Sequence, residues 1–328
     1  MRTGRVVVGD AAPSLRRLPD ASIDMVLTSP PYFRLRDYGV AGQLGLERHV
    51  DQWVDNLRKV SSELRRVLLP TGSFWLNLAD SYATHPNQGA PGKSLLLGPE
   101  RLALALLDDG WLLRNKLIWQ KANPMPSSVR DRLSCSWDVI YIFVKQPRYF
   151  FDLDAIRIPC TSPPRLISRL PDGLRQRQPW QGPNAGRGRW QHAGAPDGTA
   201  GHPLGKNPGD VWRIAGSNYR GAHYATFPVE LARRAIRAGS PEARCPRCRS
   251  PWQRRLIRSA SGGARRSALG PSCDCSVGPE PAVVLDPFFG AGTTALAAEE
   301  LGRDWLGIEL NPAFAELAEQ RIQTARVA

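Results

Sequence analysis

Short apolar runs and stretches with helical spacing alternate along the chain. Ile23–Leu27, Val283–Asp286 and Trp305–Leu310 are apolar runs of strand length, which predicts strands buried on both faces. From Leu44 to Leu69, apolar residues recur three or four positions apart, which predicts an amphipathic helix packed against a sheet. The sequence Pro70-Thr71-Gly72 should end that helix.

The remaining segments extend this alternation over most of the chain. Further strands are expected at Arg5–Asp10, Ser73–Ala79, Leu112–Gln120 and Val139–Val144, and further helices at Pro99–Leu107, Val229–Ala238, Thr294–Leu301 and Pro312–Thr324. Alternating strands and helices are typical of an α/β fold, here with a mostly parallel sheet and helices on both faces. A length of 328 residues favours one large domain and a smaller module.

The first apolar run ends in the sequence TSPPY, Thr28–Tyr32. Consecutive prolines lack N–H groups and restrain the residues before them, so the chain must leave the sheet in a stiff, extended loop. This loop presents the Ser29 hydroxyl, the carbonyl groups of Pro30 and Pro31, and the Tyr32 ring. Such oxygens can accept from an exocyclic amino group, and the ring can stack on a flat base. An ordinary proline-rich strand exit is the alternative.

A glycine-rich turn follows the strand at Val283–Asp286, in the sequence DPFFGAGTT that ends at Thr294. Glycines let the backbone approach a ligand closely, and the helix that begins there offers free N–H groups to an anionic group. The next strand carries an acid, Glu309, near its end. A Rossmann-type fold binds ribose hydroxyls with a carboxylate at this position, so a ribose-containing ligand is expected.

Together, TSPPY and DPFFGAGTT resemble the motifs of S-adenosylmethionine-dependent DNA methyltransferases that act on amino groups. Their order, with the catalytic tetrad before the cofactor loop, is similar to the permuted (beta) branch, most like its N4-cytosine type. The resemblance runs from about Val6 to Ala325, apart from two insertions. It implies a Rossmann-like methyltransferase sheet that is circularly permuted, since placing Ala282–Ala328 before Met1 restores the usual strand order.

The resemblance also assigns roles to single residues. The implied catalytic residues are Ser29, Pro30, Pro31 and Tyr32. The implied cofactor-binding residues are Asp10, Thr28, Phe227, Asp286, Pro287, Phe288, Gly290, Gly292, Thr293, Glu309 and Asn311. Asp10 would accept from the cofactor's adenine amino group and Phe227 would line its methionine end. A turn aspartate and a core phenylalanine are the respective alternatives. The segment Lys121–Ser128 again resembles the family and is expected to border the base pocket.

The charge of the chain favours a polyanionic partner. The formal net charge is +14 and the pI is about 10.1. Phosphate contacts supply most non-specific affinity for DNA, so double-stranded DNA is the expected partner. A GC-rich genome is an alternative source of the arginine excess.

Residues 152 to 222 are rich in Pro, Gly, Arg, Gln and Trp and show no clear period. We interpret them as a target-recognition segment, because Arg and Gln are side chains that read guanine and adenine edges in the major groove. The expected DNA-binding residues are Arg165, Arg169, Arg175, Arg177, Arg187, Arg189 and Lys206. A disordered linker is the alternative.

An insertion between Gly239 and Glu280 carries two cysteine pairs, Cys245 with Cys248 and Cys273 with Cys275. Two such pairs predict a structural zinc site of tetrahedral geometry, although a single residue separates the second pair where two are commoner. Free reduced thiols and redox chemistry are the alternatives. The stretch Arg233–Arg266 is rich in arginine and contains one acid, Glu242, so this insertion is also expected to contact DNA phosphates.

These observations divide the chain into four parts. We expect a catalytic half at 1–151, the target-recognition segment at 152–222, a cofactor-binding half at 223–238 and 281–328, and the zinc-binding insertion at 239–280. No apolar run reaches about 18 residues, so no membrane span is expected, and Met1–Gly9 has no hydrophobic core of signal-peptide length. The expected protein is soluble, cytoplasmic and nucleoid-associated. The resemblance also allows a companion restriction endonuclease and a homodimer.

The expected reaction is transfer of a methyl group from S-adenosylmethionine to the N4 amino group of cytosine in duplex DNA. An amino group conjugated to a ring is a poor nucleophile. Ser29 and the Pro30 carbonyl would therefore hold its hydrogens and orient its lone pair toward the methyl group. The base must flip out of the duplex and stack on Tyr32. In the family, serine at the first tetrad position mostly accompanies cytosine. N6-adenine methylation is the first alternative, followed by an RNA or protein amide methyltransferase and a non-catalytic DNA-binding protein.

Overall fold

The computed structural model describes residues 4–159, 202–217, 226–258 and 264–327. The chain divides into two compact units. The larger comprises Met1–Asp152, Gly209–Gln253 and Pro271–Ala328, and the smaller comprises Leu153–Pro208 and Arg254–Gly270. Within the described ranges, the smaller unit contains a short 3₁₀ helix, Leu153–Ala155, and an antiparallel pair of strands, β8 (Leu256–Arg258) and β9 (Ala264–Arg266).

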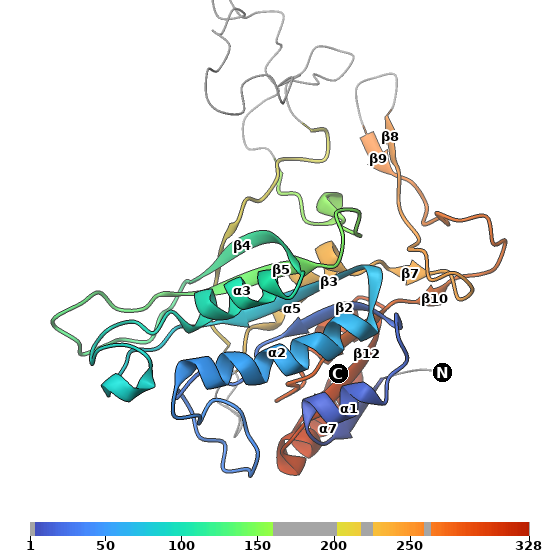
Figure 1. The fold of residues 1–328 in the computed structure, drawn as a ribbon. Coiled ribbons are helices and arrows are strands. Elements are labelled where there is room, and N and C mark those ends of the chain that lie inside the picture. The colour runs from blue at the N-terminus through green and yellow to red at the C-terminus, as the bar shows by residue number, and fades with distance from the viewer. Residues whose placement is uncertain (1–3, 160–201, 218–225, 259–263, 328) are drawn as a thin grey trace, which may run out of the picture. The chain divides into compact units, whose positions relative to one another are not determined.

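The larger unit is built on an eight-stranded sheet in the order β1-β12-β11-β2-β3-β5-β4-β6, of which Figure 1 labels β12, β2, β3, β5 and β4. In that order, the strands are Arg5–Val8, Asp304–Glu309, Val283–Asp286, Ile23–Thr28, Leu68–Leu78, Trp137–Val144, Leu112–Lys121 and Val211–Ile214. The first five strands are parallel, β5 is antiparallel to β3 and β4, and β6 is parallel to β4. Counted from β11, the parallel part has the doubly wound order 3-2-1-4-5. The expected permuted α/β fold is confirmed.

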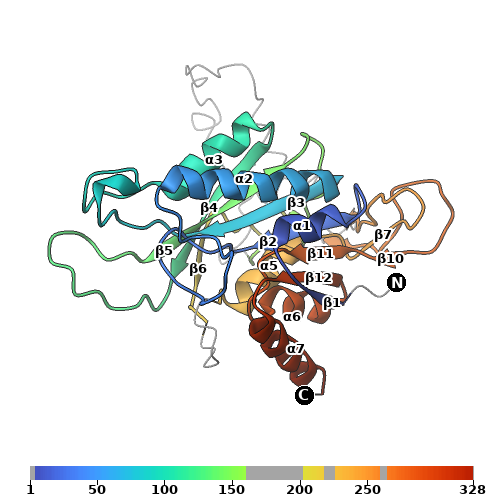
Figure 2. The same cartoon turned by 60° about the horizontal axis from the view of Figure 1, so that its bottom comes forward.

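Helices cover both faces of this sheet, as Figure 2 shows. On one face lie α1 (Ala11–Arg16), α2 (Val50–Val67) and α3 (Gly98–Asp108), and on the other lie α5 (Val229–Gly239), α6 (Thr293–Glu300) and α7 (Pro312–Val327). The larger unit also contains a 3₁₀ turn, Pro86–Gln88, and a small ladder of β7 (Ala243–Arg244) with β10 (Glu280–Pro281). None of the helices in the described ranges combines the length and apolar character of a membrane span.

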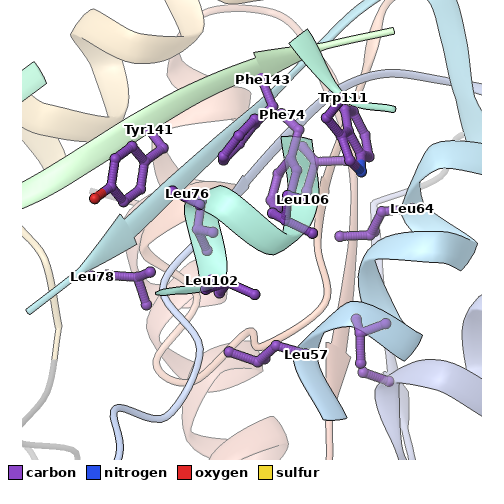
Figure 3. Close-up of a cluster of buried hydrophobic side chains, with 14 of the residues drawn as sticks. Leu57, Leu64, Phe74, Leu76, Leu78, Leu102, Leu106, Trp111, Tyr141 and Phe143 are labelled. Carbon is purple, nitrogen blue, oxygen red and sulfur yellow. The ribbon is translucent and has the colours of Figure 1, made fainter. Parts of the chain in front are cut away.

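The hydrophobic core beneath α2 and α3 is shown in Figure 3. The apolar positions that predicted α2 are all buried, and they meet side chains of β3, β5 and α3. This cluster includes Leu57, Leu64, Phe74, Leu76, Leu78, Leu102, Leu106, Trp111, Tyr141 and Phe143. Burying one such side chain contributes about 1.5–3 kcal/mol, so this core fixes the strands whose ends form the cavity described below.

Three sequence expectations about elements were wrong. The chain between Leu44 and His49 is a loop, and α2 begins only at Val50. Pro70-Thr71-Gly72 does not separate a helix from a strand, because β3 already begins at Leu68 and the pairing with β2 shifts register there. Proline is tolerated in a strand at such a bulge. The segment expected to lack a regular pattern also contributes β6 to the sheet.

Candidate active site

A cavity of about 280 Å³ opens where the strand order of the sheet reverses, between β11 and β2. It is lined by the loop after β2, the loop after β11, the end of β12 and the residues that follow β1. Ligands of open α/β sheets bind at this switch point, beyond the carboxyl ends of the strands. The two motifs of the sequence therefore meet in one site, although more than 250 positions separate them.

Tyr32 anchors the TSPPY loop through its hydroxyl. Ser29 Oγ donates to Tyr32 Oη at 3.0 Å, and Asn77 Nδ2, on β3, donates to the same oxygen at 2.9 Å. Asn77 Nδ2 also lies 3.4 Å from Ser29 Oγ. Burial, followed by the nearby Asp138 carboxylate, raises the pKa of Tyr32 well above its usual value, so the hydroxyl stays protonated at neutral pH. The network holds the Ser29 oxygen at the wall of the cavity.

The two proline carbonyls of this loop are not equivalent. Trp53 Nε1, on α2, donates to the Pro31 carbonyl at 2.9 Å. One of the two lone pairs of the Pro31 carbonyl is therefore already used by a helix side chain. No donor among the described residues reaches the Pro30 carbonyl, and Pro30 lines the cavity. Ser29 Oγ and the Pro30 carbonyl are the acceptors that this loop offers to an amino group.

Asp286 lies at the end of β11 and is buried. Its Oδ1 accepts from Thr28 Oγ1 at 2.6 Å and from the Phe288 N–H at 3.1 Å, and its Oδ2 accepts from Thr294 Oγ1 at 2.6 Å. Burial raises the pKa of Asp286 to about 7, against the opposing effect of these hydrogen bonds. Thr28, expected at the cofactor, is not part of the cavity lining. Its hydroxyl donates a hydrogen bond to Asp286 instead. Thr294 has the same role and was not expected.

Glu309 joins the ends of β11 and β12. Its Oε2 accepts from the Gly290 N–H at 2.7 Å and its Oε1 from the Asn311 N–H at 2.9 Å. Burial raises the pKa of Glu309. Each carboxylate oxygen keeps a second lone pair, so Glu309 can still accept from hydroxyl groups in the cavity. Gly292, expected at the cofactor, lies outside the cavity lining. A Cβ on it would stand 3.2 Å from Ala318 of α7.

The other expected cofactor residues line the cavity: Asp10, Phe227, Pro287, Phe288, Gly290, Thr293, Glu309 and Asn311. Asp10 also caps α1, because its Oδ1 accepts from the Ala12 N–H at 3.0 Å. The ligand and turn interpretations of Asp10 are thus compatible. Phe227 is both buried and part of the lining. Tyr38 and Phe314 add an edge-to-face aromatic pair to the wall, with ring centroids 6.2 Å apart.

Several residues of the site lie outside the short motifs. Asn77, Trp119 and Asp138 line the cavity from β3, β4 and β5, together with Lys121 at the end of β4. Lys121 is the first residue of the segment expected to border the base pocket. The sequence does carry a signal for Asn77 and Asp138, since each is a polar residue in or beside an apolar strand. Their proximity to Tyr32 depends on strand pairing, which no local pattern reveals.

The four cysteines of the insertion come together. Their sulfur atoms all lie within 4.8 Å of one another, with Cys245 buried and Cys248 exposed. A tetrahedron with zinc–sulfur bonds of about 2.3 Å has edges of about 3.8 Å, so these thiols fit a zinc ion. A hydrogen bond with Ser250 lowers the pKa of the Cys248 thiol to about 6, whereas the hydrogen bond with Cys248 raises the pKa of the Cys275 thiol to about 12, so the thiols cannot all ionise together without a cation.

Arginines of the stretch Arg233–Arg266 serve the fold as well. Arg244 is buried and pairs with Asp24 on β2 at 2.6 Å and with Glu280 at 2.8 Å. Arg233 pairs with Glu300 at 2.5 Å. The expectation that this stretch as a whole contacts phosphates is therefore wrong for Arg244, whose charge is already neutralised inside the protein.

The expected DNA-binding residues are only partly described. Lys206 is exposed and its backbone pairs with Ile158 in the smaller unit. The six expected arginines lie outside the described residues: Arg165, Arg169, Arg175, Arg177, Arg187 and Arg189.

Comparisons of the sequence with known proteins find a family model and several relatives. The family model N6_N4_Mtase, described as DNA methylase, matches residues 23–320. The Type II methyltransferase M.XycI of Xanthomonas campestris pv. cyanopsidis is 32% identical over 98% of this chain and 89% of its own length. The Type II methyltransferase M.SmaI of Serratia marcescens is 31% identical over 99% of this chain and 93% of its own length.

Solved structures share the fold. The PvuII DNA methyltransferase (cytosine-N4-specific) superposes with a TM-score of 0.58 at 19% identity, covering 98% of this chain and 90% of its own. A Thermus thermophilus protein described as a putative DNA modification methylase, solved with S-adenosyl-L-methionine, gives 0.56 at 24% identity, covering 98% and 93%. The family model spans most of the chain and the relatives nearly all of it, so the chain belongs to the N6/N4 family of DNA methylases.

Proposed function

We propose that this protein transfers a methyl group from S-adenosylmethionine to the N4 amino group of cytosine in duplex DNA. The observation that carries the proposal is that one cavity has two walls of different chemistry. One wall presents Ser29 Oγ and the Pro30 carbonyl, and the other presents the carboxylates of Asp286 and Glu309. A neutral acceptor pair suits an amino group, whereas carboxylates suit the hydroxyls and ammonium of a nucleoside amino acid.

The residues present fit S-adenosylmethionine, which would supply an electrophilic sulfonium methyl group. Glu309 can accept from ribose hydroxyls, as in other Rossmann-type sites. Asp10 lies at the rim of the cavity and can accept from the adenine amino group. Asp286, held by Thr28 and Thr294, can accept from the ammonium group of the methionine portion. The Thermus protein of the same fold was solved with this cofactor, which supports the assignment.

The chain's own contribution to the transfer is orientation. Ser29 Oγ and the Pro30 carbonyl accept the two amino hydrogens, which turns the nitrogen lone pair out of conjugation with the ring. The Tyr32 ring offers a stacking surface for a flipped base, and its hydroxyl keeps Ser29 in place. Serine, unlike aspartate, puts no negative charge beside the acceptor atoms of a cytosine ring. The fold neighbour named as cytosine-N4-specific is in line with this choice.

The net charge of +14 supports duplex DNA as the substrate. We assign sequence recognition to the segment 152–222, with Arg165, Arg169, Arg175, Arg177, Arg187, Arg189 and Lys206 as contacts. The relatives are named Type II methyltransferases, which supports a companion restriction endonuclease. A homodimer and a cytoplasmic, nucleoid-associated location remain predictions from the sequence.

The methylated atom is tested by mass spectrometry of nucleosides from duplex DNA treated with purified protein and isotope-labelled S-adenosylmethionine. We expect the label in N4-methyl-2′-deoxycytidine, none in N6-methyl-2′-deoxyadenosine, and none in RNA or protein offered in parallel. Label in methyldeoxyadenosine alone would overturn the choice of base, and label in RNA or protein alone would overturn the choice of substrate.

We further propose that Cys245, Cys248, Cys273 and Cys275 hold one structural zinc ion. The crowding of four thiols supports this, since thiolates so close together need a cation. Metal analysis of protein purified under reducing conditions should give about one zinc per chain. Cys248→Ser should lose most of the metal. Cys135→Ser is the matched control, because Cys135 is an exposed cysteine outside the cluster. Zinc-free wild-type protein, or a Cys248→Ser variant that keeps its zinc, would refute the site.

A further inference from the structure

The buried Asp138 carboxylate lines the cavity but contacts neither the cofactor nor the amino group in the proposed reaction. Asp138 begins the buried part of β5 and is 4% exposed. Strand pairing places it opposite Trp119 of β4, which is itself paired with Trp212 of β6. A carboxylate among buried tryptophans is costly unless it has a partner, so its position calls for an explanation.

Lys121 is the ion-pair partner of Asp138. Its Nζ lies 2.8 Å from Asp138 Oδ1 and 5.4 Å from the centroid of the Trp119 ring. All three side chains line the same cavity as Ser29 and Tyr32. An ammonium group has three donors, and Asp138 accepts one of them. Among the described residues no second acceptor is paired with Lys121, so its remaining donors are available to a ligand in the cavity.

We propose that Lys121 donates a hydrogen bond to a ring acceptor of the flipped cytosine, N3 or O2, and that Asp138 positions Lys121 for it. The inference rests on the proposed function and names the group that recognises its target base. Cytosine carries N3 next to its amino group and O2 beyond it, and both atoms only accept, whereas an ammonium group only donates. Ser29 and Pro30 only accept hydrogen bonds from the amino group of the base. The ring acceptors N3 and O2 therefore need a separate donor.

Asp138 also removes an electrostatic conflict. The amino nitrogen gains positive charge as it accepts the methyl group, and an unpaired ammonium nearby would oppose this. Because Lys121 and Asp138 form a pair of zero net charge, the donor can contact the ring without that penalty. Asp138 is thus a positioning residue, and Lys121 is the residue that touches the base.

The test compares Lys121→Met with Lys116→Met. Lys116 is the matched control, because it lies on the same strand, pairs with Glu100 at 2.7 Å and lies 5.9 Å from the Tyr141 ring centroid, yet is outside the cavity lining. The substrate is a duplex that carries the recognition site, which sequencing of methylated host DNA identifies. On this duplex, the kcat/KM of Lys121→Met should fall roughly ten- to a hundred-fold, as for the loss of a charged hydrogen bond. Lys121→Arg should recover part of the loss, and Lys116→Met should stay within about two-fold of wild type.

Base analogues separate recognition from folding. The target cytosine is replaced by 3-deazacytosine, which lacks the N3 acceptor, or by an aminopyridine analogue that lacks O2. On one of the two analogues, the kcat/KM of wild-type protein should fall by a factor similar to that of Lys121→Met on cytosine. On that analogue, the kcat/KM of Lys121→Met and of Asp138→Asn should be no lower than on cytosine. Calorimetry should show normal S-adenosylmethionine binding by both variants.

Two results would overturn the inference alone. One is a Lys121→Met variant with wild-type kcat/KM for making N4-methylcytosine. The other is a variant that loses the same factor as wild type on each analogue. The failure of the proposed function gives a different result. The wild-type protein itself would then methylate adenine, and no variant is needed to see it.

Discussion

Asp286 and Tyr32 face the same cavity but belong to separate hydrogen-bond networks. Asp286 is held by Thr28 at the end of β2, by Thr294 in the first turn of α6 and by the Phe288 N–H that follows β11. Tyr32 is held by Ser29 and Asn77 at the ends of β2 and β3. No described hydrogen bond connects the two side chains, so a change in one network should leave the other in place.

This separation predicts different defects for the two residues. Asp286→Ala should abolish binding of S-adenosylmethionine in calorimetry, because it removes the carboxylate and leaves two buried hydroxyls without their acceptor. Tyr32→Ala should bind the cofactor nearly normally and lose turnover. Tyr32→Phe keeps the ring but not the acceptor for Ser29, and should lose about ten-fold in kcat, the cost of about one hydrogen bond. Loss of cofactor binding by Tyr32→Ala as complete as for Asp286→Ala would contradict this division.

The sequence located site residues at strand ends and in the loops that follow better than residues inside strands. Ser29 follows β2, Asp286 ends β11 and Glu309 ends β12, and all three line the cavity. Asn77 and Asp138 could not be placed, because the register that brings β3 and β5 beside Tyr32 is set by long-range packing. Thr28 was expected at the cofactor, and its position in the motif does not show that its hydroxyl donates to Asp286 while the residue stays outside the cavity lining.

At the scale of elements, β12 and the glycine-rich loop fit together through an aromatic ring. Phe289 stacks on Trp305 with ring centroids 5.3 Å apart, and its N–H donates to the Ile308 carbonyl at 2.9 Å. Gly307, between these two strand residues, leaves space for the ring, since a Cβ there would overlap it. The next N–H of the loop, on Gly290, donates to Glu309. The position of the loop therefore depends on a missing side chain in β12.

Gly307→Ala should disturb the loop and the strand together. Pushing the Phe289 ring away should cost about 1–3 kcal/mol in the free energy of unfolding, as for other overpacked cores. It should also weaken S-adenosylmethionine binding, because the Gly290–Glu309 contact moves with the ring. Denaturant unfolding and calorimetry measure the two effects. Gly278→Ala is the control, since nothing lies near a Cβ there, and its effect should be below about 0.5 kcal/mol.

A second substitution tests the cause. If the overlap with the ring is responsible, Phe289→Leu should be less harmful in the Gly307→Ala background than in wild type, since neighbouring residues couple. Additive effects of the two changes would show that the ring is not the reason.

Element types were easier to predict than element ends. Apolar periodicity located α2 and β3, because both bury a continuous set of side chains. The junction between them was misplaced, since proline and glycine indicate a turn locally while pairing of Leu68 with Ile23 extends the strand. A Cβ on Gly72 would stand 2.7 Å from the Asp24 carbonyl oxygen, so this glycine allows a close approach between strands rather than a turn. Such an approach is visible only when both strands are in place.

At the scale of the whole molecule, one buried ion pair connects the cysteine cluster to the central sheet. Arg244 precedes Cys245 directly and reaches Asp24 on β2. Asp24 Oδ2 also accepts from the N–H of Val283, the first residue of β11. Burial raises the pKa of Asp24 to about 6, and the Arg244 guanidinium opposes that rise. The same carboxylate therefore contacts the cysteine-bearing insertion and the strand that leads to Asp286.

The sign of the pH dependence follows from this pair. The folded-state pKa of Asp24, about 6, lies above its unfolded value of about 3.9, so the folded state holds the proton more tightly between these values. The proton on Asp24 therefore stabilises the folded state at low pH, and this stabilisation is lost as the pH rises through about 6. Without Arg244 the folded pKa should rise further, and the loss should continue to higher pH.

We therefore predict that Arg244→Met destabilises the protein more at pH 8 than at pH 5. Removing one partner of a buried pair costs about 3–5 kcal/mol while the other stays charged, but at pH 5 Asp24 can keep its proton and much of that penalty disappears. Denaturant unfolding at both pH values, on samples of equal metal content, measures the difference. The double variant Asp24→Asn with Arg244→Met should lose this pH dependence, because the other partner of Arg244, Glu280, is one-third exposed and keeps its ion pair with Arg249. An equal cost of Arg244→Met at pH 5 and pH 8 would show that Arg244 acts through packing and not through the Asp24 carboxylate.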